Sequence, residues 1–234
     1  MAGQLYIVST PIGNLDDITL RALNVLREAD IIAAEDTRHT RKLLTHFDIH
    51  SNLVSCHAFN EHDKVSELVT AVINGKNIAL VSDAGTPSVA DPGFLLVNAA
   101  LNAGLEPVVI PGVSAVTFSV TASGLPVDTF TFRGFAPVKP GKRAKFFASL
   151  VEDCRTSFFF ESPFRIAKTL KELAEISPQL QMAVIREATK IHEEILRGPA
   201  AELAALKREW KGELVVGVSP QSRNSGNDSG DGDD

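Results

Sequence analysis

Short apolar runs alternate with longer amphipathic stretches through the first half of the chain. Runs of three or four apolar residues are typical of buried strands, and apolar positions three and four residues apart are typical of helices. The runs predict strands at 5–8, 31–34, 53–55, 78–81 and 107–110, and the stretches between and after them predict helices at 19–28, 37–47, 64–74, 94–103 and 113–123. Strands and helices in alternation indicate a mostly parallel sheet covered by helices.

The pattern changes after Gly124-Leu125-Pro126. Residues 129–134 alternate Thr and Phe as a half-buried strand does, and a stretch rich in Pro, Gly and Lys follows. Further strands are predicted at 157–160, 181–186, 193–197 and 213–218, with helices at 144–151, 163–176 and 199–210. We therefore expect an α/β fold of two domains, 1–124 and 125–220, with mostly parallel or mixed sheets.

Composition fits this division and adds a tail. A chain of 234 residues with 44% apolar residues can fill two cores of about a hundred residues each. Residues 221–234 contain four Asp, one Arg and no apolar residue, so we expect a disordered acidic tail. The net charge of −6 becomes −3 without this tail, which permits a local basic patch.

Targeting signals and cysteine pairs are not evident in the sequence. No apolar run approaches the roughly 20 residues that span a bilayer, and the first residues lack a basic region followed by an apolar one. We therefore expect a cytoplasmic protein. Cys56 and Cys154 have no second Cys or His at ligand spacing, which predicts two reduced packing cysteines and no metal site.

Loops of small and turn-forming residues follow three strands of the first predicted domain. They are STPIGNL at 9–15, SDAGTPS at 82–88, closed by DPG at 91–93, and PGVSA at 111–115. In open α/β sheets, ligands bind beyond the carboxyl ends of strands, and small residues let a flat ligand lie against main chain. Together the last two loops predict one cleft, whereas the first loop, taken alone, is more simply explained as an ordinary strand-to-helix turn.

The chemistry of these loops disfavours a phosphate-rich cofactor. They contain no Lys or Arg, and neither a Walker motif nor G-x-G-x-x-G occurs in the chain. S-adenosylmethionine carries a sulfonium cation and a zwitterionic amino acid, which suit a pocket of backbone groups with one carboxylate. Asp83 is the carboxylate we expect there, with capping of a turn as the alternative role.

Two adjacent acids, Glu35 and Asp36, follow the second predicted strand and precede a helix. Negative charge is favourable at a helix N-terminus for purely structural reasons. The functional alternative is that Glu35 or Asp36 accepts a proton or orients a hydroxyl while Arg38 holds a phosphate. The sequence leaves both interpretations open.

A basic segment without acids runs from Thr129 to Val151. Its cations could contact a nucleic-acid backbone, and the interleaved Phe residues are expected mainly in the core. A solvated loop is the alternative for the cations, which are Arg133, Lys139, Lys142, Arg143 and Lys145. Charged residues also end two later predicted strands, at 160–165 and 186–194, where a surface salt-bridge network is the alternative to a site.

Taken in order, these motifs resemble the ribosomal small-subunit RNA cytidine ribose 2′-O-methyltransferase I family, a branch of the tetrapyrrole methylase superfamily. The resemblance runs from about Leu5 to Val218. The motifs that carry it are TPIGNLDDIT, AEDTRHTRKLL, SDAGTPSVADPG, PGVSA, SGLP, FRGFAP, FFESPFR, REATKIHEE and GELVVGV.

The resemblance implies a methyltransferase with S-adenosylmethionine held in the cleft between two α/β domains. Its substrate would be a cytidine ribose in small-subunit (16S) ribosomal RNA, its partner that RNA or the small ribosomal subunit, and its assembly a homodimer. No metal is needed for in-line attack of a ribose oxygen on the methyl group, because alignment of the substrates is the enzyme's main contribution.

Roles carried over by motif fall into three groups. The methionine side would be lined by Asp83, Ala84, Gly85, Val89, Ser114 and Ala115, and the adenosine by Phe160, Arg186, Glu187, Gly198 and Pro199. The incoming nucleotide would face Pro11, which also borders the cofactor, and Gly13, Asn14, Glu35, Asp36, Arg38 and Lys190. A carboxylate or a neutral Lys within reach would remove the hydroxyl proton, so the catalytic candidates are Glu35, Asp36, Arg38 and Lys190.

Two departures qualify the resemblance. Phe164 stands where the family usually has His, so no acid/base role is assigned there. Family members commonly continue into a small helical region beyond the position of Val218, and we expect its loss to affect RNA affinity more than cofactor binding. Two alternatives remain: a methylase of a tetrapyrrole or other small molecule, and a non-catalytic ribosome-assembly factor that retains the cleft.

Overall fold

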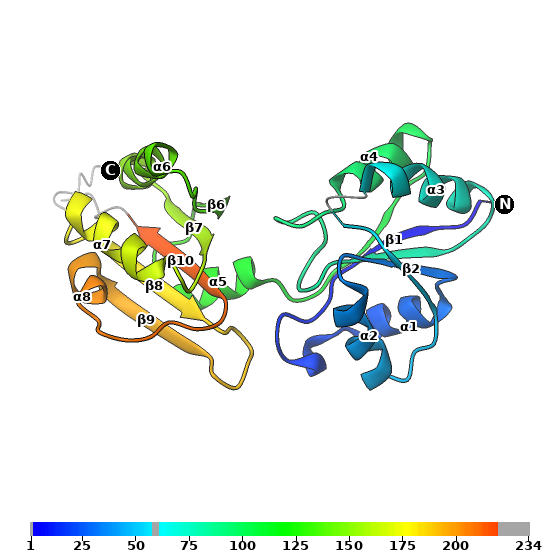
Figure 1. The fold of residues 1–234 in the computed structure, drawn as a ribbon, viewed down its shortest axis with the longest axis horizontal. Coiled ribbons are helices and arrows are strands. Elements are labelled where there is room, and N and C mark those ends of the chain that lie inside the picture. Colours follow the sequence, from blue (N-terminus) through cyan, green and yellow to red (C-terminus); the bar gives the residue numbers. More distant parts are fainter. Residues whose placement is uncertain (1, 58–60, 220–234) are drawn as a thin grey trace, which may run out of the picture. The chain divides into compact units, whose positions relative to one another are not determined.

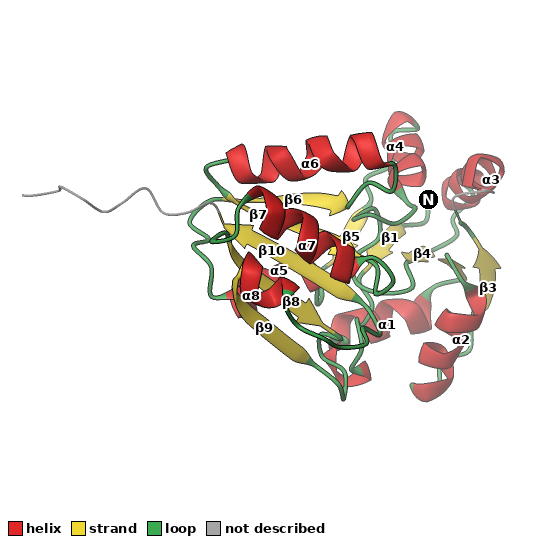
Figure 2. Ribbon diagram, turned by 60° about the vertical axis from the view of Figure 1, so that its left-hand side comes forward, coloured by secondary structure: helices red, strands yellow, loops and turns green. Residues whose placement is uncertain are grey.

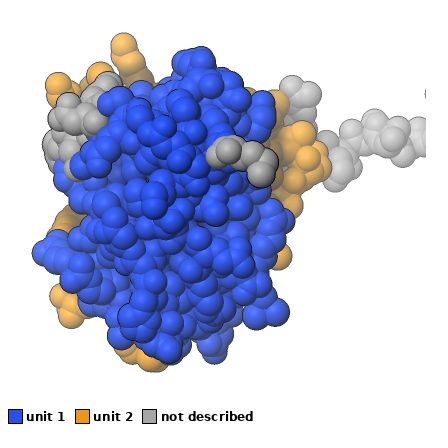
Figure 3. All heavy atoms as spheres, turned by 90° about the vertical axis from the view of Figure 1, so that its right-hand side faces the viewer, with its two compact units in different colours: residues 1–118 blue, residues 119–234 orange. Residues whose placement is uncertain are grey.

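The computed structural model describes residues 2–57 and 61–219, so the expected tail at 221–234 lies outside the described residues. The chain divides into two compact units, 1–118 and 119–234, coloured blue and orange in Figure 3. The division falls within one helix, α5 (Ala115–Ser123), and thus before the expected boundary after Gly124.

Unit 1 is built on a five-stranded parallel sheet (Figure 1). Its strand order is β3-β2-β4-β1-β5, and every strand predicted in this half of the chain is present. The strands are β1 (Leu5–Val8), β2 (Ile31–Ala34), β3 (Asn52–Ser55), β4 (Ile78–Val81) and β5 (Val108–Ile110). The helices are the short 3-10 helix η1 (Leu15–Asp17), α1 (Leu20–Glu28), α2 (Thr37–His46), α3 (Glu61–Ile73), α4 (Phe94–Asn102) and α5.

The sheet of unit 1 is covered on both faces, which explains why its strands are continuous apolar runs. All four residues of β4 are buried. Leu26 of α1 and Leu44 of α2 belong to the core on one face, and Leu68 of α3 and Leu96 of α4 belong to the core on the other. In Figure 1, α1 and α2 accordingly lie on one side of the sheet and α3 and α4 on the other.

Unit 2 holds a mixed five-stranded sheet of order β6-β7-β10-β8-β9 (Figure 2). Only β6 and β7 pair in parallel, and the remaining neighbours are antiparallel. The strands are β6 (Phe130–Phe135), β7 (Thr156–Glu161), β8 (Gln181–Arg186), β9 (Glu194–Pro199) and β10 (Leu214–Ser219). The helices α6 (Pro140–Glu152), α7 (Ile166–Ile176) and α8 (Ala200–Ala204) contribute to its core.

Helix ends are where the structure of unit 2 differs from the sequence prediction. Helix α6 begins earlier than predicted, with Pro140 in its first turn, where a missing N–H costs nothing. Helix α7 begins later, since the chain first turns with the N–H of Arg165 donating to the carbonyl of Ser162. Helix α8 ends at Ala204 rather than near Trp210, because the following chain is irregular and brings the Trp210 ring into the core.

Two other expectations concern cysteines and membranes. Cys56 is buried, but Cys154 is exposed, so the prediction that both are packing residues is wrong for Cys154. Within the part of the chain that the structure describes, no helix combines the length and apolar character needed to cross a bilayer.

Candidate active site

The candidate site of unit 1 lies at the carboxyl edge of its sheet. Strands β2, β4, β1 and β5 are parallel neighbours, so the loops that follow them emerge together. Thr10, after β1, and Gly85, after β4, exchange two backbone hydrogen bonds of 2.8 and 3.0 Å. The hydroxyl of Ser9 lies 2.9 Å from that of Thr86, and the hydroxyl of Thr10 donates to the carbonyl of Ser82. These bonds join the first two predicted loops into one surface.

Glycines are required at two points of this surface. Gly85 has φ +78°, in the left-handed region that favours glycine. Gly112, after β5, approaches Ser9 so closely that a Cβ at position 112 would lie 2.8 Å from the Ser9 Cβ. The third predicted loop therefore joins the other two, and its last residues, Ser114 and Ala115, lead into α5, which begins at Ala115.

Asp83 and Asp36 connect the loop after β2 to this surface. The backbone N–H of Asp36 donates to Oδ1 of Asp83 at 2.9 Å, so the carboxylate of Asp83 orders the start of α2. Asp36 is the N-cap of α2 and accepts from the backbone N–H of Arg38. The Arg38 guanidinium donates to both carboxylate oxygens of Asp36, at 3.1 and 2.7 Å, and holds the pKa of Asp36 well below its usual range. A carboxylate held in this way is a poor proton acceptor, which favours the capping interpretation for Asp36.

Glu35 has the opposite electrostatic environment. Its side chain is partly buried, and burial together with the negative charges of Asp91 and Asp83 raises its pKa above the usual 4.5. A backbone hydrogen bond from Asp83 and the nearby His57 oppose this rise only in part. Carboxylates with raised pKa values at a strand end are good candidates for general bases. Of the two adjacent acids, Glu35 therefore suits proton transfer.

The structure does not bring all the predicted site residues of unit 2 together. Arg186 ends β8 and pairs with Glu194 of β9, whereas Gly198 and Pro199 pair with Met182 and Gln181 at the opposite end of this antiparallel strand pair. Arg186 donates to the Glu194 carboxylate and to the carbonyls of His192 and Lys211, so its guanidinium is engaged within this unit. Lys190 lies 2.9 Å from Glu187 and 2.7 Å from Glu213. Although burial lowers the pKa of Lys190, hydrogen bonds to these two carboxylates outweigh it and raise the pKa. Lys190 is therefore charged, and the expectation of a neutral lysine base is wrong for this residue.

Three more predicted residues of unit 2 occupy strand ends. Phe160, near the end of β7, makes ring contacts with Phe132 and Phe135 of β6. Gly198 has φ +147° and precedes Pro199, the N-cap of α8. These residues belong to unit 2, whereas Glu35 and the three joined loops belong to unit 1.

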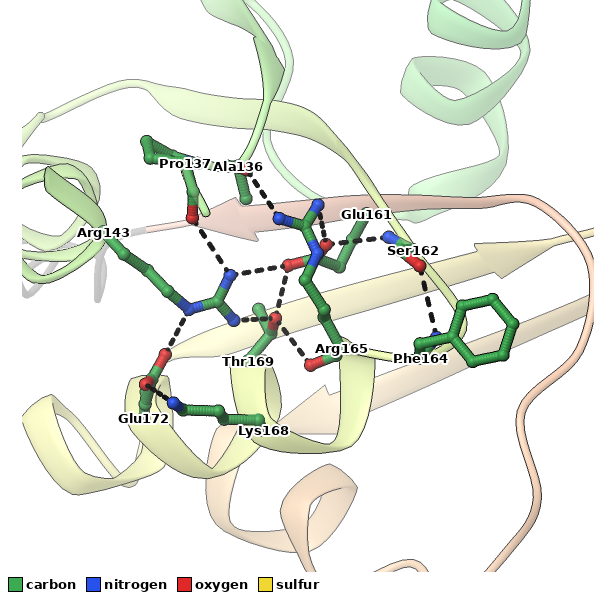
Figure 4. A network of polar contacts seen from close by, with 10 residues as sticks. All are labelled: Ala136, Pro137, Arg143, Glu161, Ser162, Phe164, Arg165, Lys168, Thr169 and Glu172. Atoms are coloured by element: carbon green, nitrogen blue, oxygen red, sulfur yellow. Dashed lines mark hydrogen bonds and ion pairs between the residues drawn. The ribbon is translucent and has the colours of Figure 1, made fainter. Parts of the chain in front are cut away.

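The basic segment divides into exposed cations and one buried arginine. Arg133, Lys139, Lys142 and Lys145 are exposed. The side chain of Arg143 is only 5% exposed, so the prediction that it contacts RNA is wrong. Arg143 instead donates to the fully buried carboxylate of Glu161 and to Glu172 (Figure 4). The prediction that the Phe residues are mainly core holds for Phe146 and Phe147, which pack in the unit 2 core, but not for Phe135, which is 60% exposed.

Sequence reasoning assigned no role to several residues that build the site. Ser9, Thr10 and Thr86 link the loops through their hydroxyls and backbone, and Asp91 acts electrostatically on Glu35. Asp91 could have been found, because it opens the DPG turn that closes the loop after β4. The hydroxyl contacts could not, because they depend on β1 and β4 being neighbours despite their separation in sequence.

Comparison with known proteins agrees with this fold. The family model for Tetrapyrrole (Corrin/Porphyrin) Methylases matches residues 4–204. A solved structure of uroporphyrin-III C-methyltransferase from Thermus thermophilus, complexed with S-adenosyl homocysteine, is similar with a TM-score of 0.62 and 20% identity, covering 92% of this chain and 97% of that one. The chain is therefore a member of the tetrapyrrole methylase family.

The relatives that are more similar in sequence define its place within that family. Ribosomal RNA small subunit methyltransferase I of Xylella fastidiosa is 47% identical over 92% of this chain and 80% of that protein. The protein of the same name from Halalkalibacterium halodurans is 45% identical over 92% of this chain and 75% of its own length. The chain belongs to the ribosomal RNA small subunit methyltransferase I family, as the motifs predict.

Proposed function

We propose that this protein transfers a methyl group from S-adenosylmethionine to the ribose 2′-hydroxyl of a cytidine in small-subunit ribosomal RNA. One observation carries the mechanism. Glu35, a carboxylate of raised pKa, lies at the same edge of the sheet as three joined loops of small residues. Family membership supplies the substrate class, since the relatives are ribosomal RNA small subunit methyltransferases.

The loops after β1, β4 and β5 fit the proposed cofactor. Ala84 and Gly112 carry little or no side chain, so a flat ligand can lie against their backbone, while buried Gly85 uses its N–H and carbonyl to join this loop to Thr10. Asp83 supplies a carboxylate at the same edge. S-adenosylmethionine, when bound, supplies an electrophilic methyl group and two charges that such a surface can stabilise. We assign the methionine side to Asp83, Ala84, Gly85, Val89, Ser114 and Ala115.

Glu35 is the proposed general base. Its carboxylate would accept the proton of the ribose hydroxyl, a poor nucleophile at neutral pH, as the oxygen bonds to the methyl carbon. Asp36 would act by positioning Arg38, since it holds the guanidinium in place by two hydrogen bonds while Arg38 remains largely exposed to solvent. Lys190, being charged, would bind phosphate or position Glu187 rather than accept a proton.

The remaining assignments rest on the family resemblance. Contacts of the adenosine with Phe160, Arg186, Glu187, Gly198 and Pro199 stay a prediction, as do those of the nucleotide with Pro11, Gly13 and Asn14. The exposed Arg133, Lys139, Lys142 and Lys145 remain candidates for RNA contact. Single alanine variants, with RNA affinity and cofactor affinity measured separately, would show which of these residues contact RNA and which contact the cofactor.

The test is transfer of label from tritiated S-adenosylmethionine to three acceptors: naked small-subunit RNA, assembled small subunits and a tetrapyrrole. We expect label in RNA, at a ribose, from one of the first two. Label only in the tetrapyrrole would favour a small-molecule methylase. No label in any acceptor, with cofactor binding intact, would favour a ribosome-assembly factor.

We further propose that the protein is a cytoplasmic homodimer. The proposed substrate is part of the ribosome, which places the reaction in the cytoplasm. Sedimentation of the purified protein at micromolar concentration should give twice the monomer mass of 25.1 kDa, and a monomer mass at all concentrations would contradict the dimer.

A further inference from the structure

Helix α2 carries a stripe of basic residues along one face. Arg38, Arg41, Lys42, Thr45 and His46 stand at the i, i+3, i+4, i+7 and i+8 positions that share a helix face. They line one shallow, open groove on the surface of unit 1. At 1.5 Å per residue the stripe is about 12 Å long. We call these five residues the α2 stripe.

The α2 stripe contains exposed cations that have no neighbouring acid on their own helix. Residues 37–47 contain no acid. Among the described residues, Arg41 and Lys42 form no ion pair, and both are exposed. The exposed lysines of α7, by contrast, pair with glutamates one turn away. The acids nearest in sequence are already engaged: Asp36 pairs with Arg38, and Asp48 lies 3.8 Å from His50.

The other face of α2 explains why the stripe points outward. Leu43 and Leu44 are buried, and Leu44 belongs to the core beneath the sheet. The helix could be held by these apolar contacts with any polar residues on its exposed face. Folding of α2 therefore does not depend on Arg41 and Lys42, and these two unpaired cations form a local positive surface, suited to a polyanion, in a chain of net charge −6.

The position of the α2 stripe relates it to the proposed chemistry. Helix α2 begins directly after Glu35 and Asp36, so Arg38 lies one turn from the proposed base. The stripe continues from Arg38 away from the carboxyl edge of the sheet. A polyanion lying along it would therefore enter the site at Glu35.

We infer that the α2 stripe binds the phosphate backbone of the substrate RNA next to the modified nucleotide. This inference rests on the proposed function and adds a binding surface to it. Arg41 and Lys42 neutralise phosphates, Thr45 and His46 donate hydrogen bonds, and Arg38, held by Asp36, marks the end nearest the reacting ribose. Phosphate contacts fix register without reading sequence, so the stripe positions RNA while other contacts select the nucleotide.

The test compares Arg41→Gln/Lys42→Gln with Arg27→Gln/Lys76→Gln. Both double variants remove two exposed cations from unit 1, but Arg27 and Lys76 lie near the amino ends of β2 and β4, at the opposite edge of the sheet. Binding of transcribed small-subunit RNA is measured from 50 to 200 mM salt. We expect the slope of log affinity against log salt to fall by about one unit per removed α2 cation and to stay unchanged in the control.

Methyl transfer provides the second readout. The α2 variant should lose at least tenfold in kcat/KM for the RNA acceptor at 150 mM salt, with unchanged calorimetric affinity for S-adenosylmethionine. The single variants should each show part of the effect, and circular dichroism checks that all variants fold.

The outcomes separate the two proposals. If the wild type methylates RNA and the α2 variant has the wild-type salt slope and kcat/KM, the inference is wrong while the proposed function stands. If the wild type transfers no methyl group but the α2 variant still loses salt-dependent RNA binding relative to the control, the proposed function fails and the binding surface stands.

Discussion

At the scale of single residues, Glu35 and Asp36 show that the pKa values of two adjacent carboxylates can shift in opposite directions. The raised pKa of Glu35 comes first from burial and then from the charges of Asp91 and Asp83. The lowered pKa of Asp36 comes first from hydrogen bonds with Arg38. The same sequence motif thus contains a carboxylate of raised pKa, our proposed proton acceptor, and a helix cap, and the difference depends on side-chain surroundings.

Replacement of Glu35 by Gln tests the first role. We expect turnover to fall by about a hundredfold or more, because the proton of the ribose hydroxyl loses its acceptor. In the wild type the rate should decline as pH falls through a pKa above 4.5, and this decline should be absent from the residual activity of the variant. Cofactor affinity, measured by calorimetry, should change little. An unaltered pH profile in Glu35→Gln would exclude Glu35 as the base.

The substitution Asp91→Asn tests whether the charge of Asp91 contributes to the raised pKa of Glu35. Removal of a negative charge near Glu35 makes its ionised form more favourable, so the pKa of Glu35 should fall and the acid decline in rate should move to lower pH. The measurement is the pH dependence of kcat in both proteins, with Asp17→Asn, a half-buried acid of η1, as the charge-matched control. A decline that moves to higher pH would contradict this account.

The sequence placed these residues at a site but could not rank them. Glu35 and Asp36 were recognisable as candidates because they follow an apolar strand, where ligands bind in open α/β sheets, although acids are also common at helix N-termini. The raised pKa of Glu35 could not be predicted, because Asp83 and Asp91, whose charges contribute to it, lie more than forty residues away along the chain. Arg143 was misjudged for the same reason: its carboxylate partners come from other elements.

At the scale of elements, a buried ionic network joins α6, β7 and α7. Glu161, at the end of β7, accepts hydrogen bonds from Arg143 at 3.1 Å and Thr169 at 2.5 Å, and its other oxygen lies 2.6 Å from Arg165 (Figure 4). Arg165 also donates to the carbonyl of Ala136, so the network fixes the chain after β6 as well. Buried charges are tolerated when they are paired and fully hydrogen-bonded.

Glu161→Ala should therefore destabilise unit 2 strongly. The variant removes the carboxylate that Arg165 binds and one of the two that the buried Arg143 binds, and we expect a loss of about 3–5 kcal/mol in the free energy of unfolding. Lys171→Ala, which removes an exposed ion pair with Glu175 on α7, should cost less than about 1 kcal/mol. Urea unfolding followed by circular dichroism measures the loss of unfolding free energy in both variants. Equal losses in the two variants would show that the buried network stabilises unit 2 no more than an exposed ion pair does.

The stability of unit 2 at acid pH should depend on the ion pairs of Glu194, one of which is formed with Arg208 in the loop between α8 and β10. Two hydrogen bonds from Arg208, with a contribution from Arg186, lower the pKa of Glu194 from 4.5 to about 2. The stability from this folded-state shift is present above pH 4.5 and is lost as pH falls toward 2. We expect the difference in unfolding free energy between wild type and Glu194→Gln to shrink over that interval. A constant difference from pH 7 to pH 2 would rule this out.

Elements with a strong local signal were predictable, and those decided by tertiary contacts were not. The buried run of β4 and the amphipathic α2 carry their structure in their own residues. The end of α8 does not, since Leu206, Lys207 and Arg208 are good helix formers. The helix ends early because Trp210 packs into the core and Arg208 forms an ion pair with Glu194. The local sequence does not reveal these two contacts.

At the scale of the whole molecule, the two units have separate cores. Leu26 belongs to a core built from unit 1 alone, and Leu150 belongs to a core built from unit 2 alone. Alternation of strands and helices predicted two α/β domains, and the parallel and mixed sheets confirm that class. The strand orders were not predictable, since local patterns say nothing about which strands are neighbours.

Separate cores should give separable unfolding. Leu26→Ala and Leu150→Ala each create a cavity expected to cost about 2–5 kcal/mol. We expect amide hydrogen exchange in urea to rise mainly within 2–118 for Leu26→Ala and mainly within 119–219 for Leu150→Ala. Uniform acceleration throughout the chain in both variants would show that the molecule unfolds as one cooperative block.

The shared carboxylate of Glu161 also constrains how this protein can change over evolutionary time. Loss of Arg143 or Arg165 alone leaves a buried negative charge undercompensated, while loss of Glu161 alone removes the carboxylate that the two cations share. A lineage can replace these side chains only by passing through a destabilised intermediate or by changing them jointly. Positions 143, 161 and 165 are therefore expected to covary among homologues, as a polar triad in some and as apolar residues of similar volume in others.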